Sequence, residues 1–99
     1  MLEKISSEVD LLERHLAVMR VVANQGPIGI MKLTDELNQS QHRIRYSLRV
    51  LEQMQYIQAT QAGAVATPKA FEMLKNFDSD LDALLKKLSR LRPGDADRK

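Results

Sequence analysis

Apolar side chains recur at alternating steps of three and four residues towards both ends of the chain. This spacing places them on one face of a helix, so it predicts a long amphipathic helix over residues 2–24 and another over 68–91. The unbroken leucine register across Ser79 favours one continuous second helix. The first stripe comprises Leu2, Ile5, Val9, Leu12, Leu16, Met19 and Ala23, and the second comprises Leu74, Phe77, Leu81, Leu84, Leu88 and Leu91.

Two shorter helices are predicted after the first long one. Gly26 and Pro27 end that helix, because glycine suits a C-terminal cap and proline cannot continue a helix. The segment "IGIMKLTDEL" has helical apolar spacing, and "NQS" interrupts it before Ser40, a good N-cap for a helix over residues 40–54. Two helices joined by about three residues are typical of a helix-turn-helix.

The helix over residues 40–54 has two chemically different sides. At about 100° per residue, Ile44, Ser47, Leu48, Leu51 and Met54 share one side, which we expect to face the core. The other side carries basic and hydrogen-bonding groups, with Arg43 at its flank; it comprises His42, Arg45, Tyr46, Arg49 and Gln53.

The segment "QYIQATQAGAVAT", residues 55–67, contains no charged residue and is rich in residues that favour strands. We predict one short hairpin here, with Gly63 at the turn. Thr67 then caps the last helix, and Pro68 occupies a position that the first helical turn accepts.

Length and composition narrow the class of protein. The chain has 99 residues, no cysteine and a net charge of +2. One mainly helical domain over residues 1–92 is expected, followed by a disordered tail over 93–99. No apolar run approaches the ~20 residues of a membrane span, so a soluble, cytoplasmic protein without membrane contact is expected.

Catalytic motifs are missing from the sequence. It has two histidines, no His-Glu-x-x-His pair, no glycine-rich phosphate loop and no Gly-x-Ser-x-Gly elbow. The segment "DSDLD" at 78–82 lacks the spacing and the glycine of a calcium loop, so it is better explained as a solvated helix face. We therefore expect no enzyme, no cofactor and no metal site.

The order of these elements and several of their motifs resemble the winged helix-turn-helix domain of archaeal and bacterial transcriptional regulators. The resemblance covers about residues 26 to 71. It depends on a Gly-Pro entry, leucines four apart in the second helix, a serine that opens the third helix, and an "RxxLxxLE" run before a strand. The matching residues are Gly26, Pro27, Leu33, Leu37, Ser40, Ile44, Arg45, Leu48, Leu51, Glu52, Tyr56 and Ile57.

The chain departs from that pattern at four positions. Asn38, Gln55 and Ala70 stand where glycine is usual, and Gln39 stands where an apolar residue is usual. Asparagine is tolerated at the first of these because it can adopt the left-handed backbone conformation.

The resemblance implies that the helix over residues 40–54 enters the major groove of double-stranded DNA. Arginine pairs with guanine, and glutamine pairs with adenine, through two hydrogen bonds. The uncharged hairpin is the weaker part of this expectation. The predicted DNA-binding residues are Lys32, Ser40, Gln41, His42, Arg43, Arg45, Tyr46, Arg49, Thr60 and Gln61. Arginines that merely keep a surface helix soluble remain the alternative.

The terminal stripes are longer than so small a core can cover. We expect Leu16 to Ala23 and Phe71 to Leu74 to seal the domain, and the remaining parts to form a homodimer. Dimerisation would place two recognition helices on half-sites about 34 Å apart. The predicted dimer residues are Ile5, Val9, Leu12, Phe77, Leu81, Leu84, Leu88 and Leu91. Packing of the first helix on the last within one chain is the alternative.

The sequence thus predicts a homodimeric winged helix-turn-helix transcriptional regulator. An architectural DNA-binding protein with little sequence preference is one alternative. A winged-helix module that binds another protein is a second, favoured by the uncharged hairpin and the small net charge. A small-molecule effector is neither identified nor excluded.

Overall fold

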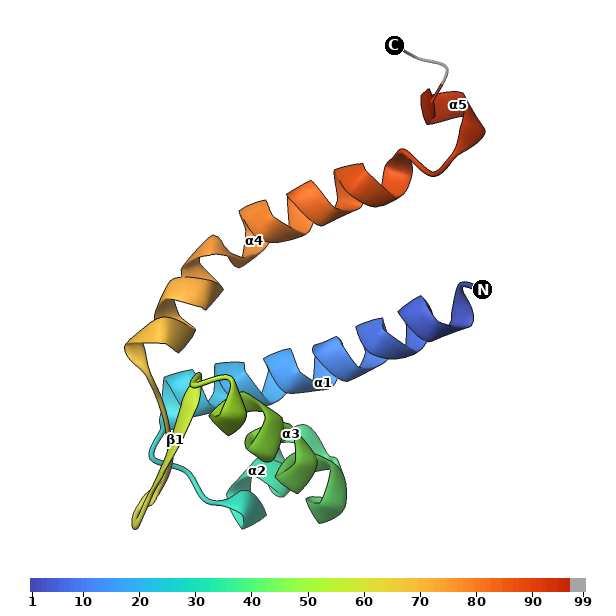
Figure 1. Cartoon of the computed structure of the whole chain (residues 1–99). Coiled ribbons are helices and arrows are strands. Elements are labelled where there is room, and N and C mark those ends of the chain that lie inside the picture. Colours follow the sequence, from blue (N-terminus) through green and yellow to red (C-terminus); the bar gives the residue numbers. More distant parts are fainter. Residues whose placement is uncertain (97–99) are drawn as a thin grey trace.

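The computed structural model describes residues 1–96 and shows a mainly helical chain with one two-stranded antiparallel hairpin. Its elements are α1 (Glu3–Gln25), α2 (Ile30–Leu37), α3 (Gln41–Gln53), β1 (Ile57–Thr60), β2 (Gly63–Ala66), α4 (Pro68–Ser89) and α5 (Pro93–Ala96). This layout is compatible with a winged-helix-like arrangement (Figure 1). Residues 93–96 of the expected disordered tail form α5, and 97–99 lie outside the described residues.

The hydrophobic core lies between the second half of α1, α2, α3, the hairpin and the start of α4. Figure 1 shows α2, α3 and the hairpin gathered beside the C-terminal half of α1. The side chains of Val18, Leu33 and Ile44 are completely buried. Among the residues whose burial the structure describes, the buried apolar ones fall between Leu16 and Ala70, so we call residues 16–74 the core unit.

The turn between α2 and α3 forms as its residue types predict. Asn38 adopts the left-handed conformation (φ 51°), which asparagine tolerates better than most residues. Ser40 then caps α3, because its hydroxyl accepts a hydrogen bond from the backbone N–H of Arg43 (3.2 Å). Gln55, also at a position where glycine was expected, has φ 66° after α3 ends.

The hairpin pairs Ile57 with Ala66 and Thr60 with Gly63. Its turn lies at residues 61–62, one position earlier than predicted, and Gly63 opens β2 with φ 131°. A Cβ at this glycine would lie 2.6 Å from a backbone atom of Ile28. The close approach exists because Ile28 and Ala64 exchange two backbone hydrogen bonds, which attach the α1–α2 connection to the hairpin.

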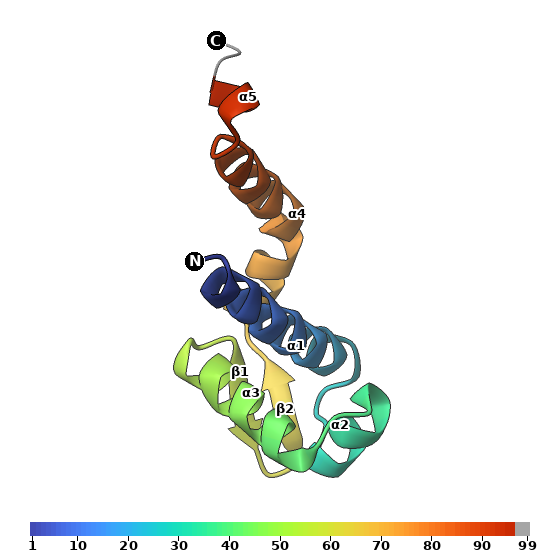
Figure 2. The same ribbon diagram turned by 90° about the vertical axis from the view of Figure 1, so that its right-hand side faces the viewer.

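Two helical segments extend beyond the core unit, and we call them the arms: residues 3–15 of α1 and 75–89 of α4 (Figures 1 and 2). The radius of gyration is 16.2 Å, whereas a compact chain of this length has about 13 Å. Only their inner ends meet the core unit, so the two terminal helices do not fold back into one compact domain.

The structure corrects the expected seal at the start of α4. Phe71 is 52% exposed, whereas Ala70 is completely buried and Leu74 packs against the edge of the core. The continuous last helix is confirmed, but it ends at Ser89, so Leu91 lies beyond its regular register.

Candidate nucleic-acid interface

Helix α3 is held against the core unit along one side. The side chains of Ile44, Ser47 and Leu51 are 0–2% exposed, as expected from their common face. Met54, predicted on the same side, is exposed because α3 ends at Gln53 and the chain turns away. Burial of this row fixes which residues of α3 face solvent.

The solvent side of α3 presents a row of basic residues, which we call the outer row. His42, Arg45 and Arg49 are all exposed, spaced three and four residues apart on one helix face. No salt bridge within residues 1–96 involves either arginine. Their guanidinium groups are therefore available to an external hydrogen-bond acceptor.

Two predicted DNA-binding residues of α3 lie on a different flank. The Tyr46 ring centroid is 6.0 Å from that of His15 in α1. Arg43, one turn earlier, lines a cleft together with Arg14 of α1. Residues three apart share a flank of a helix, so both side chains face α1 more than the outer row does.

The predicted contacts near the start of α3 are exposed but partly engaged. Ser40 is the N-cap described above, and the Gln41 amide Nε2 donates to the sulfur of Met31 (2.8 Å). Lys32 is exposed on α2. None of these groups belongs to the outer row.

The tip of the hairpin offers little to hold an anion. The Thr60 hydroxyl donates to the backbone carbonyl of Gly63 (2.7 Å) and accepts from the N–H of Ala62 (3.2 Å). Its proton is therefore engaged within the turn, while Gln61 stays exposed. Lys69, at the base, donates to the carbonyl of Met54 (2.8 Å).

A polar contact that the sequence analysis did not find joins α1 to α3. The buried Ser47 hydroxyl lies 3.2 Å from Arg14 Nε and 2.8 Å from His15 Nδ1. Arginine always donates, so the hydroxyl accepts from Arg14 and can give its own proton to neutral His15. The signal was a serine on the core-facing side of α3, since a buried hydroxyl needs polar partners.

The surroundings of His15 favour its neutral form. Partial burial lowers the pKa of His15, and the positive charge of the neighbouring Arg14 lowers it further. A neutral imidazole keeps Nδ1 able to accept the Ser47 proton. The α1–α3 contact is therefore best formed when His15 carries no charge.

Seven of the eight predicted dimer residues lie along the arms, and Leu91 lies just beyond the end of α4. Seven of the eight are 37–72% exposed. Phe77 differs, because it is partly buried and the Arg20 guanidinium lies 5.6 Å from its ring centroid. The exposed members are Ile5, Val9, Leu12, Leu81, Leu84, Leu88 and Leu91.

Among residues 1–96, no three histidine, cysteine or carboxylate side chains are grouped so as to hold a metal ion. The described helices also include none with the length and apolarity needed to span a membrane.

Comparison of the sequence with models of known protein families and with curated protein sequences finds no match.

Proposed function

We propose that this chain is a homodimeric DNA-binding transcriptional regulator of the winged helix-turn-helix type. The observation that supports the proposal is the row of His42, Arg45 and Arg49 on the solvent side of a helix whose other side is buried. An exposed helix with basic side chains at this spacing fits the major groove of DNA.

The outer row contacts the edges of the DNA bases directly. Arg45 and Arg49 can each donate two parallel hydrogen bonds to a guanine or to a phosphate. Rigid attachment of α3 through Ile44 and Leu51 limits the entropy lost when the helix binds. The hairpin contributes little, because it has no charged residue and its Thr60 proton is engaged.

The arms form the interface with the second subunit. Their exposed apolar stripes are unpartnered within residues 1–96, and helices with a sustained heptad stripe associate through it. Two copies also double the number of phosphate contacts, which offsets the small net charge of one chain.

Charge along α4 favours an antiparallel pair of α4 helices. Asp78, Asp80 and Asp82 precede Lys86, Lys87 and Arg90. A parallel pair would set acids beside acids and bases beside bases, whereas an antiparallel pair sets each cluster beside its opposite.

The heptad positions give the antiparallel pair a register. Leu81 and Leu88 occupy one of the two core positions of the heptad, and Leu84 occupies the other. Asp80 immediately precedes Leu81, and Lys87 immediately precedes Leu88. In antiparallel helices these flanking positions face their own counterparts, so Asp80 of one subunit meets Lys87 of the other, twice per dimer.

DNA binding is tested with the double variant Arg45→Ala/Arg49→Ala. We expect the affinity to fall about ten-fold or more. The salt dependence should become shallower by about one unit for each phosphate that an arginine no longer neutralises. The control, Lys4→Ala/Lys75→Ala, removes the same charge from exposed positions outside α3.

A competition measurement and the double arginine variant together separate the regulator from the architectural and the protein-binding alternatives. Competition between random DNA and selected sites should give a large specificity ratio for a regulator, and a ratio near one for an architectural protein. Unchanged affinity and salt dependence in the double arginine variant would contradict the DNA proposal and favour a protein-binding module.

The dimer is tested by charge exchange. Asp80→Lys and Lys87→Asp should each weaken association several-fold, because each creates two like-charge contacts, and the two changes combined should restore it. Sedimentation equilibrium gives the dissociation constants. A doubly changed protein weaker than either single variant would contradict the antiparallel register.

A further inference from the structure

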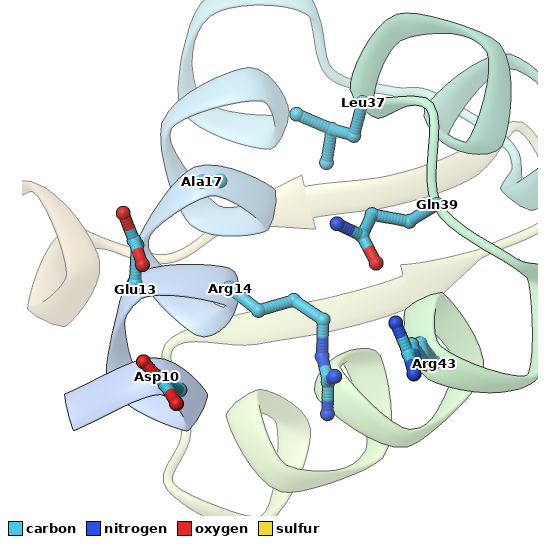
Figure 3. A pocket seen from close by; sticks show the side chains of 7 residues that line it. All are labelled: Asp10, Glu13, Arg14, Ala17, Leu37, Gln39 and Arg43. Atoms are coloured by element: carbon cyan, nitrogen blue, oxygen red, sulfur yellow. The ribbon is translucent and has the colours of Figure 1, made fainter. Parts of the chain in front are cut away.

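A polar cleft separates the first half of α1 from the start of α3 (Figure 3). Its volume is about 450 Å³, within the range of small-molecule sites. It lies beside the outer row of α3 without including any member of it. The cleft therefore offers a separate position for a ligand.

Two guanidinium groups face this cleft. Figure 3 shows the side chain of Arg14 extending from α1 towards α3, and Arg14 and Arg43 both line the cleft. Arg14 is half-buried and anchored through Nε to the Ser47 hydroxyl (3.2 Å), which fixes the plane of the group. Neither arginine has a carboxylate within salt-bridge distance among residues 1–96.

Such a pair of arginines is suited to an anion. Two positive charges that line one cleft repel each other, and an anion bound in the cleft reduces that repulsion. A guanidinium group matches a carboxylate with two parallel hydrogen bonds, and prior anchoring of Arg14 reduces the entropy lost on binding. The Gln39 side chain, which lines the same cleft, adds an amide group.

The α1 side of the cleft carries the opposite charge. Asp10 and Glu13 line it, while Ala17 and Leu37 form an apolar part of the wall. Two carboxylates would repel the continuous phosphate chain of a DNA duplex. They would instead attract an ammonium group on a small ligand whose anionic end is held by the arginines.

We propose that this cleft is a binding site for a small zwitterion, a free α-amino acid, with its carboxylate on Arg14 and Arg43 and its ammonium group towards Asp10 and Glu13. The ligand would join α1, which carries an arm, to the start of the helix with the outer row. Binding itself does not depend on the proposed function. Its effect on DNA affinity does rest on that function.

The test uses the full chain without DNA. The side-chain Nε–H resonance of Arg14, observed by ¹⁵N NMR, is followed while each of the common L-amino acids is added at constant ionic strength. We expect at least one amino acid to shift this resonance in a saturable manner. Its N-acetyl and amide derivatives, which lack the ammonium or the carboxylate, should bind about ten-fold more weakly or worse.

Matched variants locate the site. Arg43→Gln should weaken binding about ten-fold, and Glu13→Gln should reduce the preference for the free amino acid over its N-acetyl derivative. Arg49→Gln, on the outer row of the same helix, should bind the amino acid as the unchanged chain does. Loss of DNA binding by Arg49→Gln would report on the proposed function alone.

Three results would overturn the inference. One is that no amino acid shifts the Arg14 resonance. Another is that an N-acetyl derivative binds as tightly as the free amino acid. The third is that a DNA duplex perturbs Arg14 while amino acids do not, which would make the cleft part of a nucleic-acid surface.

Discussion

The core unit and the arms contain the same kind of amphipathic helix, but its apolar face is buried in the core unit and exposed in the arms. In the core unit, Leu33 and Ile44 are completely buried. In the arms, Val9 and Leu84 are about half exposed (54% and 45%). A helical stripe indicates that something covers it, but the stripe alone does not say whether the cover is the same chain or another molecule.

The difference assigns separate roles to the two regions. The core unit is held together by its own side chains and presents one fixed polar face. Among residues 1–96, the arms leave about half of each long helix without a partner, so burial of their apolar stripes would require another molecule. Changes in the core unit should therefore lower the stability of dilute protein. With the proposed dimer, changes in the arms should lower stability only at protein concentrations at which the subunits associate.

Leu33→Ala should give the largest effect. Leu33 is completely buried at the centre of the core, so the change should lower the free energy of unfolding by about 2–5 kcal/mol through reduced burial and a cavity. Urea denaturation of dilute protein measures it.

The matched control is Leu85→Ala in the arm, where the leucine is 52% exposed. Its effect in dilute protein should stay within about 0.5 kcal/mol. Equal effects of the two leucine changes would remove the distinction between the regions.

Ser47→Ala should have the next largest effect. It would remove the hydroxyl that Arg14 and His15 share and leave both with unpaired, partly buried polar atoms, at a cost of about 1–3 kcal/mol. Ser79→Ala, in the exposed arm, removes a hydroxyl that contacts only a carbonyl of its own helix and should cost far less. A small effect at Ser47 would mean that the α1–α3 contact does not stabilise the core unit.

Thr67 tests the junction between the core unit and the second arm. Its hydroxyl caps α4 by accepting from the N–H of Ala70 (3.3 Å) and donates to the carbonyl of Gln55 (2.7 Å). Thr67→Ala should cost about 0.5–2 kcal/mol, and Thr67→Ser, which keeps the hydroxyl, should cost less. Circular dichroism during thermal unfolding measures both. Equal losses in the two variants would rule out the hydroxyl as the cause.

The sequence predicted local structure well where the residue type itself decides it. Ser40 and Thr67 cap helices because their hydroxyls accept backbone N–H groups, and Asn38 adopts the left-handed turn. The helical spacing of apolar residues also identified the buried side of α3, including Ser47.

Contacts between distant segments were not predictable in the same way. The pairing of Ile28 with Ala64 depends on the path of the chain, and no local pattern marks it. Arg14 and Ser47 are 33 residues apart. The core-facing position of Ser47 indicates a buried hydroxyl, but it does not identify Arg14 as its partner. Phe71 was expected to be buried, but α4 turns Ala70 and Leu74 towards the core instead.

The smallest predicted effect is a pH dependence at the contact between α1 and α3. Burial, followed by the charge of Arg14, lowers the pKa of His15 in the folded chain below its ordinary value of 6.5. The unfolded chain therefore binds the proton more readily, and folded stability must fall as pH drops below about 6.5. Above that pH both states are neutral at His15, and the full stability is present.

Chemical denaturation at about pH 7 and about pH 5.5 measures this decline. His15→Asn keeps an acceptor near the Ser47 hydroxyl but cannot be protonated, so the decline between the two pH values should be smaller than in the unchanged chain. His42→Asn, on the exposed outer row, should retain the full decline. An unchanged decline in His15→Asn would show that another group causes it.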